Sequence, residues 1–220
     1  PRLVYLATLA HVGSAGVSHA FVVSHVAPGR SYLIRALGPA LGGMGALGNP
    51  RLGIFAGQTA LAANDDWGGS ARVTTLGETL GAMPLPADSR DAALEFTPPA
   101  AGVYAAQVTG TAGAQGLTLI EIFEVDAGRA TAIPLSLVAL PQTVTVDAGQ
   151  PARFGVVAIG RPLPAYQWSK GGVNLIANGP TLDLGPVQVG DAGNYEVRVT
   201  SGATTHTATA TLVVTPTNNA

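Results

Sequence analysis

Alternating apolar and polar residues are the main pattern in the second half of the chain. Val144 and Val146 alternate with threonines, and after a turn at 147–149 a second apolar run covers 152–158. Side chains of a β-strand point to opposite faces in turn, so both runs predict strands. By the same criterion, further strands are predicted at 165–170, 181–184, 196–200 and 205–214.

The first half is a similar succession of short apolar runs separated by turn residues. Only 71–80 has its apolar residues at helical spacing, with Val73, Leu76 and Leu80 on one side. Regular breaks of this kind favour a sandwich or a jelly roll over an α/β fold. Strands are predicted at 3–9, 20–23, 32–36, 52–55, 93–96, 102–108 and 116–123.

The predicted fold class is therefore all-β, with two β-sandwich domains in tandem. A length of 220 residues suits two domains of about 100 residues each. Residues 127–134 show no alternation and are predicted to be a linker. The first domain then covers 1–126 and is jelly-roll-like or similar, and the second covers 135–220.

Composition narrows the function classes. Charged residues make up 11% of the chain, against about 25% in an average domain. The net charge is −2 and no run of Lys or Arg occurs, so nucleic acid is not an expected partner. No apolar stretch reaches the length of a membrane helix, so no membrane span is predicted. The absence of Cys excludes disulfides, thiolate catalysis and Cys-based zinc sites.

Three motifs of the second half resemble those of an immunoglobulin-like domain of the intermediate type. Gly160 to Trp168 read G-x-P-x-P-x-x-x-W, and Asp191 to Tyr195 read D-x-G-x-Y. A turn at 201–202 precedes the long last strand. The resemblance implies an immunoglobulin-like sandwich built around Trp168.

The resemblance also implies roles for four core residues. Val156 and Val197 occupy the positions of the family's usual disulfide, so a Val–Val contact against Trp168 is expected in place of the bridge, as in Cys-free bacterial versions of the domain. Tyr195 is implied to form a tyrosine corner, with its hydroxyl bonded to nearby backbone. Plain core packing is the alternative interpretation of Tyr195.

Nearly the whole first half resembles a module of large secreted proteins of environmental bacteria. The family has no assigned catalytic residue, so the resemblance implies export and display. The predicted location is extracellular or at the cell surface. The matching stretches are 33–41, 64–67, 102–104 and 116–123.

The densest group of oxygen ligands is Asn64-Asp65-Asp66, which Asp88 or Asp91 could complete as a calcium site if the loops meet. The alternative is a turn whose side chains bond their own backbone. No other cofactor is predicted. Trp67, next to this cluster, is interpreted either as a sugar-stacking platform or as a core anchor.

No arrangement of residues predicts an enzyme. Residues 43–48 match the letters of a dinucleotide fingerprint, but Asn49-Pro50 follow where a helix must begin, which favours a glycine-rich loop. His19 and His25 are roughly 20 Å apart along a strand, too far to share a metal. Ser14 does not lie in a nucleophile elbow.

The low charge favours a structural or adhesion module that self-associates in a cell-surface array or filament. The expected partners are other copies or neighbouring surface modules. Strand addition is predicted through an apolar segment at the start of the chain. Its residues are Leu3, Val4, Tyr5, Leu6, Ala7, Thr8 and Leu9.

The alternative function is a carbohydrate-binding accessory module of a secreted multidomain hydrolase, with a polysaccharide as ligand. Trp67, Tyr5 or Tyr32 would then stack on sugar rings. The last strand also places a row of threonines on one face, which is interpreted as a solvated face or as a contact for a sugar or another strand. The row consists of Thr205, Thr207, Thr209 and Thr211.

Overall fold

The computed structural model describes residues 5–23, 30–42, 45–125 and 133–216. The chain divides into two compact units. The first contains 1–39, 46–80 and 84–131, and the second contains 132–220 together with the short segments 40–45 and 81–83.

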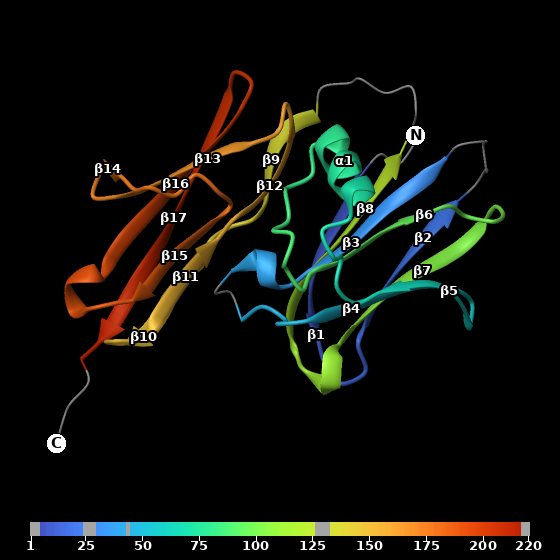
Figure 1. Ribbon diagram of the computed structural model, residues 1–220, viewed down its shortest axis with the longest axis horizontal. Helices are drawn as coiled ribbons and strands as arrows, with labels where there is room; N and C mark the ends of the chain where they lie inside the picture. Colours follow the sequence, from blue (N-terminus) through green and yellow to red (C-terminus); the bar gives the residue numbers. More distant parts are fainter. Residues whose placement is uncertain (1–4, 24–29, 43–44, 126–132, 217–220) are drawn as a thin grey trace. The chain divides into compact units, whose positions relative to one another are not determined.

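The first unit is an eight-stranded jelly roll (Figure 1). One sheet has the order β1-β8-β3-β6 and the other has the order β2-β7-β4-β5. The first strand pairs antiparallel with the last, the second with the seventh, the third with the sixth and the fourth with the fifth. The strands are β1 (Tyr5–Val12), β2 (Val17–Val23), β3 (Ser31–Leu37), β4 (Pro50–Ala56), β5 (Thr59–Asn64), β6 (Ala92–Phe96), β7 (Gly102–Gly110) and β8 (Gly116–Val125).

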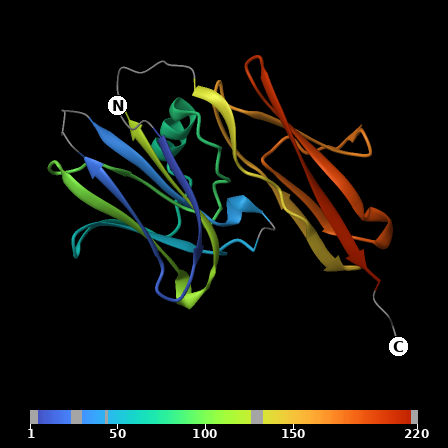
Figure 2. The same ribbon diagram turned by 180° about the vertical axis from the view of Figure 1, so that it is seen from behind.

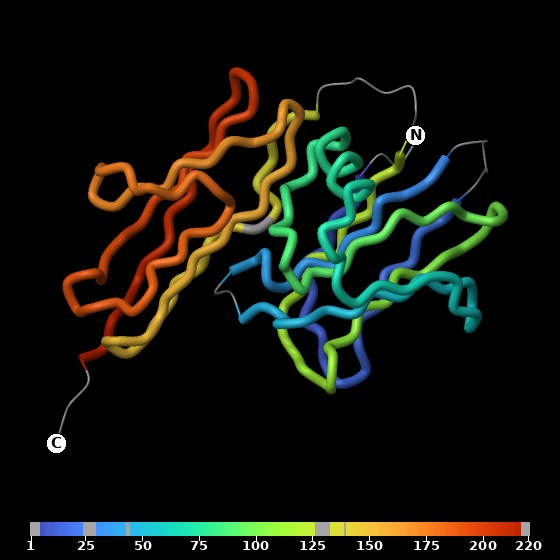
Figure 3. The backbone as a smooth tube through the Cα atoms, viewed as in Figure 1, coloured from blue at the N-terminus to red at the C-terminus, as the bar shows by residue number. Residues whose placement is uncertain are grey.

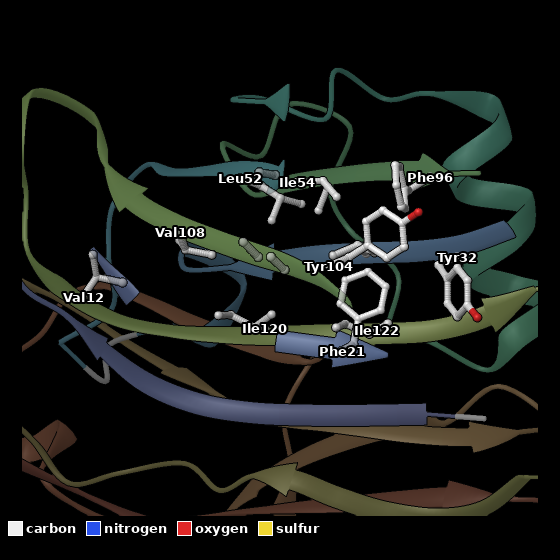
Figure 4. Close-up of a cluster of buried hydrophobic side chains, with 14 of the residues drawn as sticks. Val12, Phe21, Tyr32, Leu52, Ile54, Phe96, Tyr104, Val108, Ile120 and Ile122 are labelled. Atoms are coloured by element: carbon white, nitrogen blue, oxygen red, sulfur yellow. The ribbon is translucent and has the colours of Figure 1, made fainter. Parts of the chain in front are cut away.

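The two sheets of the jelly roll enclose one apolar core (Figure 4). Every other residue of each strand points into it, as with Ile120 and Ile122 of β8 or Ile34 and Ala36 of β3. Four aromatic rings meet at one end of this core, with centroids 5.3 to 5.8 Å apart in the contacting pairs. They belong to Phe21, Tyr32, Phe96 and Tyr104.

Helix α1 (Ala71–Leu80) has the predicted bounds and packs against β3, β6 and β8 (Figures 1 and 2). It buries Val73 and Leu76. The outer face of sheet β1-β8-β3-β6 is therefore partly covered, and all seven residues of β3 are buried. Two short 3-10 helices, η1 (Pro39–Leu41) and η2 (Thr111–Gly113), lie in the connections.

Strand β5 was not predicted from the sequence. Its residues, Thr-Ala-Leu-Ala-Ala-Asn, include three alanines, which are poor strand formers. The strand exists because it pairs with β4 at the sheet edge, an interaction with no signature in the segment itself.

The second unit is also a two-sheet sandwich. Its larger sheet has the order β10-β17-β16-β13-β14, in which β10 runs parallel to β17 and the other pairs are antiparallel. The pairs β11-β15 and β12-β9 make up the remaining ladders. The elements are β9 (Ile133–Ala139), β10 (Val144–Asp147), β11 (Pro151–Gly155), β12 (Val157–Arg161), β13 (Ala165–Lys170), β14 (Val173–Asn174), β15 (Thr181–Pro186), η3 (Val189–Asp191), β16 (Gly193–Ser201) and β17 (Thr204–Thr215).

The all-β prediction is confirmed, but two local predictions need correction. Strand β9 begins at Ile133, inside the predicted linker 127–134, whose residues up to 132 lie outside the described part of the chain. The predicted single strand 152–158 is two strands, β11 and β12, which pair with β15 and β9. Figure 3 traces this run in gold as one extended segment.

The break between β11 and β12 falls at Val156, whose N–H donates to the carbonyl of Pro180 at 2.9 Å. Phe154, Val156 and Ala158 nevertheless all point into the same core. Burial thus keeps its period of two while the hydrogen-bonding partner changes. The alternation of apolar residues indicates which side chains are buried but not which strand they pair with, and for this reason it predicts a single strand over 152–158.

Candidate binding surfaces

The four core residues implied by the immunoglobulin-like motifs lie inside the second sandwich. Val156, Trp168 and Val197 are fully buried in one cluster. The indole N–H of Trp168 donates to the carbonyl of Gly179 at 3.0 Å. The hydroxyl of Tyr195 donates to the carbonyl of Asp191 at 2.8 Å, closing the corner before β16. These side chains are buried and hold the fold.

The Asn64-Asp65-Asp66 loop uses its polar atoms on its own neighbourhood. Asn64 Oδ1 accepts from the N–H of Ala93 at 2.9 Å, and Asn64 Nδ2 donates to the carbonyl of Asp66 at 3.0 Å. Asp65 Oδ1 accepts from the Thr111 hydroxyl at 3.2 Å. Within the described residues no group of three or more His, Asp or Glu side chains converges as a metal site. Calcium binding stays a prediction of the sequence.

Asp91, a candidate ligand of the same calcium site, is buried and forms hydrogen bonds with the surrounding loops. One carboxylate oxygen accepts from the N–H of Gly38 at 2.7 Å, and the other accepts from the Ser89 hydroxyl. Its carbonyl accepts from the N–H of Trp67 at 3.0 Å. Trp67 is itself buried, with its indole N–H bonded to the carbonyl of Pro86. Asp88, in contrast, is exposed.

Segment 5–9 of the predicted assembly strand lies in β1, whereas Leu3 and Val4 fall outside the described residues. Strand β1 pairs along its length with β8 and stands at the end of its sheet. One side of its backbone is therefore bonded within the domain, and the other lies at the sheet edge. Leu9, near the middle of the strand, is 47% exposed.

A buried polar cluster links β1, β8 and β3. Arg35 and Glu121 are opposite residues of β3 and β8, and Arg35 Nε donates to Glu121 Oε2 at 2.8 Å. The hydroxyl of Tyr5 donates to Glu121 Oε1 at 2.9 Å, and its ring packs on Phe123. Burial and the Glu121 carboxylate raise the pKa of Tyr5 far above its usual 10.0. The signal for this cluster was Arg35 within the apolar run 32–36 and Glu121 within the run 116–123.

The aromatic residues named as sugar-stacking candidates are engaged inside the jelly roll. Trp67 and Tyr32 are buried, so their interpretation as stacking residues is wrong. Tyr5 is half-buried against Phe123. All twelve aromatic side chains of the chain fall within the described residues, and apart from Tyr5 only Phe55 is not buried.

The threonine row of β17 belongs to a polar sheet face. Thr205, Thr207 and Thr209 are exposed, and Thr211 donates to Asn194 Oδ1 at 2.9 Å. Ser169, Glu196 and Thr209 stand side by side in register and line a shallow pocket of about 220 Å³. The rest of its lining comes from Gly171, Gly172, Asn194 and Tyr195.

The residues weighed for catalysis stay apart. His19 lies near the Thr8 hydroxyl, with 3.4 Å between Nδ1 and Oγ1, and His25 is outside the described residues. Of the glycine-rich stretch 43–48, Gly43 and Met44 are also outside them, and strand β4 follows the stretch where a nucleotide-binding fold needs a helix. Over the described ranges, no helix is both long and apolar enough to cross a membrane.

Comparison with known proteins defines the class of the second unit. The profile of the immunoglobulin I-set domain matches residues 135–214. This part of the chain is an immunoglobulin-like domain, and it carries the parallel β10-β17 pairing together with the buried Trp168 and the Tyr195 corner.

The relatives that match this chain include Kin of IRRE-like protein 2 of Mus musculus and of Homo sapiens. The mouse protein is 42% identical over 77 residues, which is 33% of this chain and 11% of the relative. The human protein is 38% identical over 81 residues, 34% of this chain and 11% of the relative. The chain therefore spans about a tenth of the length of the curated relatives it matches.

Solved structures similar to this chain include immunoglobulin domains of titin. The complex of titin M10 with obscurin-like 1 Ig has 29% identity and a TM-score of 0.36, covering 39% of this chain and 97% of that one. Titin domain M7 has 23% identity and a TM-score of 0.36, covering 40% of this chain and 99% of that one.

Proposed function

We propose that this chain is a structural or adhesion module that works outside the cell and associates with further copies of itself. The observation that carries the proposal is the position of β1. An apolar strand stands at the edge of its sheet, with one row of backbone groups beyond the β8 ladder. Unpaired edge groups of this kind are templates for pairing with another strand.

The chemistry of the described surface agrees with a role in assembly. In the immunoglobulin-like half, the motif residues Trp168 and Tyr195 are buried in the domain's own core. In the jelly roll, the side chain of Asn64 in the Asn64-Asp65-Asp66 loop forms its hydrogen bonds with backbone groups of the same domain. With a net charge of only −2, mutual repulsion between copies is weak.

Light scattering coupled to gel filtration, over a concentration series of the full chain, tests the proposal. We expect the average mass to rise with concentration. Leu9→Lys places a charge in the middle of the β1 edge, a substitution that protects natural edge strands from pairing. This variant should shift association to higher concentration.

The matched control is Leu140→Lys, since Leu140 is 51% exposed and lies outside β1. It should associate as the unmodified chain does. A chain that stays monomeric at every concentration, and that binds a polysaccharide in affinity electrophoresis, would instead support the carbohydrate-binding function. Equal association of both Lys variants would exclude the β1 edge while leaving self-association standing.

A further inference from the structure

The sequence contains one Asn-Gly dipeptide, Asn178-Gly179, in the connection between β14 and β15. In such a dipeptide the backbone nitrogen of the second residue can attack the side-chain carbonyl carbon of the asparagine. Glycine leaves that nitrogen unshielded, because it has no Cβ atom. In a folded chain the reaction also requires that the attacking and attacked groups are accessible and not held by hydrogen bonds.

Both reacting groups meet this requirement. Asn178 is exposed and lies in neither a helix nor a strand. Among the described residues, no hydrogen bond is made by the Asn178 side chain, by its carbonyl or by the Gly179 N–H. The peptide group between the two residues can therefore turn without breaking a hydrogen bond. A Cβ atom placed on Gly179 would meet nothing within 4 Å, so the attacking residue stands in open space.

The four other asparagines within the described ranges lack this combination. Asn64 and Asn194 use their side chains in hydrogen bonds of 2.9 to 3.0 Å. The N–H that follows Asn174 donates to a carbonyl of β13 at 2.8 Å. The residue after Asn49 is a proline, which has no N–H. Reactivity is therefore expected at Asn178 and not at these four positions.

We propose that Asn178 is a site of self-modification, where the chain converts this asparagine into aspartate and isoaspartate, and that the isoaspartate form releases the indole of Trp168. The Gly179 nitrogen loses its proton and forms a bond to Asn178 Cγ. The bond from Cγ to the side-chain nitrogen breaks, and ammonia leaves. The product of this step is a cyclic imide.

Water opens the imide in either of two ways. Attack of water on Cγ breaks its bond to the Gly179 nitrogen, restores the ordinary main chain and gives aspartate. Attack on the main-chain carbonyl carbon of residue 178 gives isoaspartate, in which the main chain runs through Cβ and Cγ. The net reaction consumes one water and releases one ammonia, and it needs no other reactant.

The neighbours of Asn178 hold the loop on the core of the immunoglobulin-like domain. The Ala177 carbonyl accepts from the backbone N–H of Trp168 at 3.3 Å. The Gly179 carbonyl accepts from the indole N–H of the same tryptophan at 3.0 Å. Both hydrogen bonds end on one residue, so the main-chain path between the two carbonyls fits a fixed separation.

Isoaspartate lengthens this path by one carbon atom. The chain beyond it is fixed, because the Pro180 carbonyl accepts from the Val156 N–H at 2.9 Å and β15 begins at the next residue. The added length is therefore taken up at Gly179, whose carbonyl moves away from the indole. Aspartate leaves the main chain unchanged and should leave the indole hydrogen bond in place.

Peptide mapping of the full chain, aged in buffer and sampled over time, tests the site. Trypsin cleaves after Lys170 and Arg198, so Asn174, Asn178 and Asn194 lie in one peptide. The mass increase from amide to acid should accumulate at position 178 and not at the other two. Its rate should rise with pH, because the deprotonated backbone nitrogen is the attacking group.

Gly179→Ala is the matched variant. The backbone of Gly179 is outside the left-handed region and its Cβ position is open, so the fold should accept alanine. The added methyl group shields the nitrogen and should slow the mass increase severalfold. Asn178→Gln should remove it, because the longer side chain would have to close a larger ring. Equal rates in Gly179→Ala and the unmodified chain would contradict attack by this nitrogen.

Nuclear magnetic resonance of the indole N–H groups tests the consequence for the core. The chain has two tryptophans, and the indole of Trp67 is bonded to the carbonyl of Pro86 in the jelly roll, so its signal is an internal reference. A second Trp168 signal, with faster solvent exchange, should grow in proportion to isoaspartate. The isoaspartate fraction is measured independently with an endoproteinase that cleaves before aspartate but not before isoaspartate.

Each outcome decides one part of the proposal. A chain without mass increase at position 178, or with equal increases at all three asparagines of the tryptic peptide, overturns the modification site. Isoaspartate at position 178 with an unchanged Trp168 indole signal overturns the link to the core. Neither result affects the self-association proposed above, because Asn178 lies outside β1.

Discussion

The guanidinium of Arg35 and the carboxylate of Glu121 face each other across neighbouring strands, on the side of sheet β1-β8-β3-β6 that points away from the jelly-roll core, and are buried there at 2% and 0% exposure. The hydroxyl of Tyr5, on the edge strand β1, donates a hydrogen bond to Glu121 of this pair. The cluster thus ties the first strand of the fold to its two central strands. Removing either charge would leave the other buried.

Glu121→Gln should therefore destabilise the jelly roll by about 3–5 kcal/mol, the usual effect of breaking a buried ion pair. Amide hydrogen exchange of β3 and β8 peptides measures the loss locally. The double variant Arg35→Met with Glu121→Leu should lose less than Glu121→Gln alone, because no charge stays buried. A double variant as unstable as the single one would contradict this account.

The Tyr5 hydroxyl makes stability depend on alkaline pH. Its pKa in the folded chain is raised above the usual 10.0, first by burial and then by Glu121. The unfolded chain therefore releases this proton at lower pH than the folded chain, so stability falls as pH rises above 10. Tyr5→Phe should be destabilised by about 1–2 kcal/mol at pH 8 through the lost hydrogen bond.

Urea unfolding at pH 8 and pH 11 checks the sign of this effect. The unmodified chain should lose more stability between these two pH values than Tyr5→Phe, which lacks the titrating group. Parallel losses would show that Tyr5 is not the group responsible.

The exposed pair between Arg72 and Glu95 joins helix α1 to β6. Arg72 donates two hydrogen bonds to Glu95 at 2.7 Å, and these lower the pKa of the Glu95 carboxyl below its usual 4.5. Arg72→Ala should raise that pKa toward its usual value. NMR titration of the Glu95 side-chain carbons measures the change.

The sign of the stability effect follows from the same shift. A carboxyl group whose pKa is lower in the folded chain than in the unfolded chain stabilises the fold at pH values above its unfolded pKa. This stabilisation is lost as the pH falls through the folded pKa. Arg72→Ala should therefore unfold with a shallower acid dependence than the unmodified chain. Ser31→Ala should raise the pKa of Glu95 less than Arg72→Ala does, since the hydrogen bond from the Ser31 hydroxyl is a smaller cause of the lowered pKa.

The second sandwich provides a test of the disulfide replacement. Val156 and Val197 are both fully buried in the cluster that contains Trp168. The double variant Val156→Cys with Val197→Cys should form a disulfide under oxidising conditions and gain about 2–4 kcal/mol over its reduced form. Mass spectrometry and urea unfolding, with and without reductant, measure both. Thiols that stay free under oxidising conditions would place the two positions too far apart.

Local patterns in the sequence predicted much of this fold. The period of two located most strands, and the spacing of Val73, Leu76 and Leu80 predicted helix α1 with its observed bounds. Strands β5, β9 and β14 were not predicted, β5 because alanines carry little strand preference, and 152–158 was predicted as one strand because burial continues through a change of partner.

The sequence by itself determined most of the apolar positions that are buried, since their burial follows from the local alternation of apolar side chains and from the Trp168 and Tyr195 motifs. Only the tertiary structure decided which strands pair. Pairing set Arg35 opposite Glu121 and left β1 at a sheet edge. Hydrogen bonds between strands join backbone groups distant in the sequence, and backbone groups are the same at every residue.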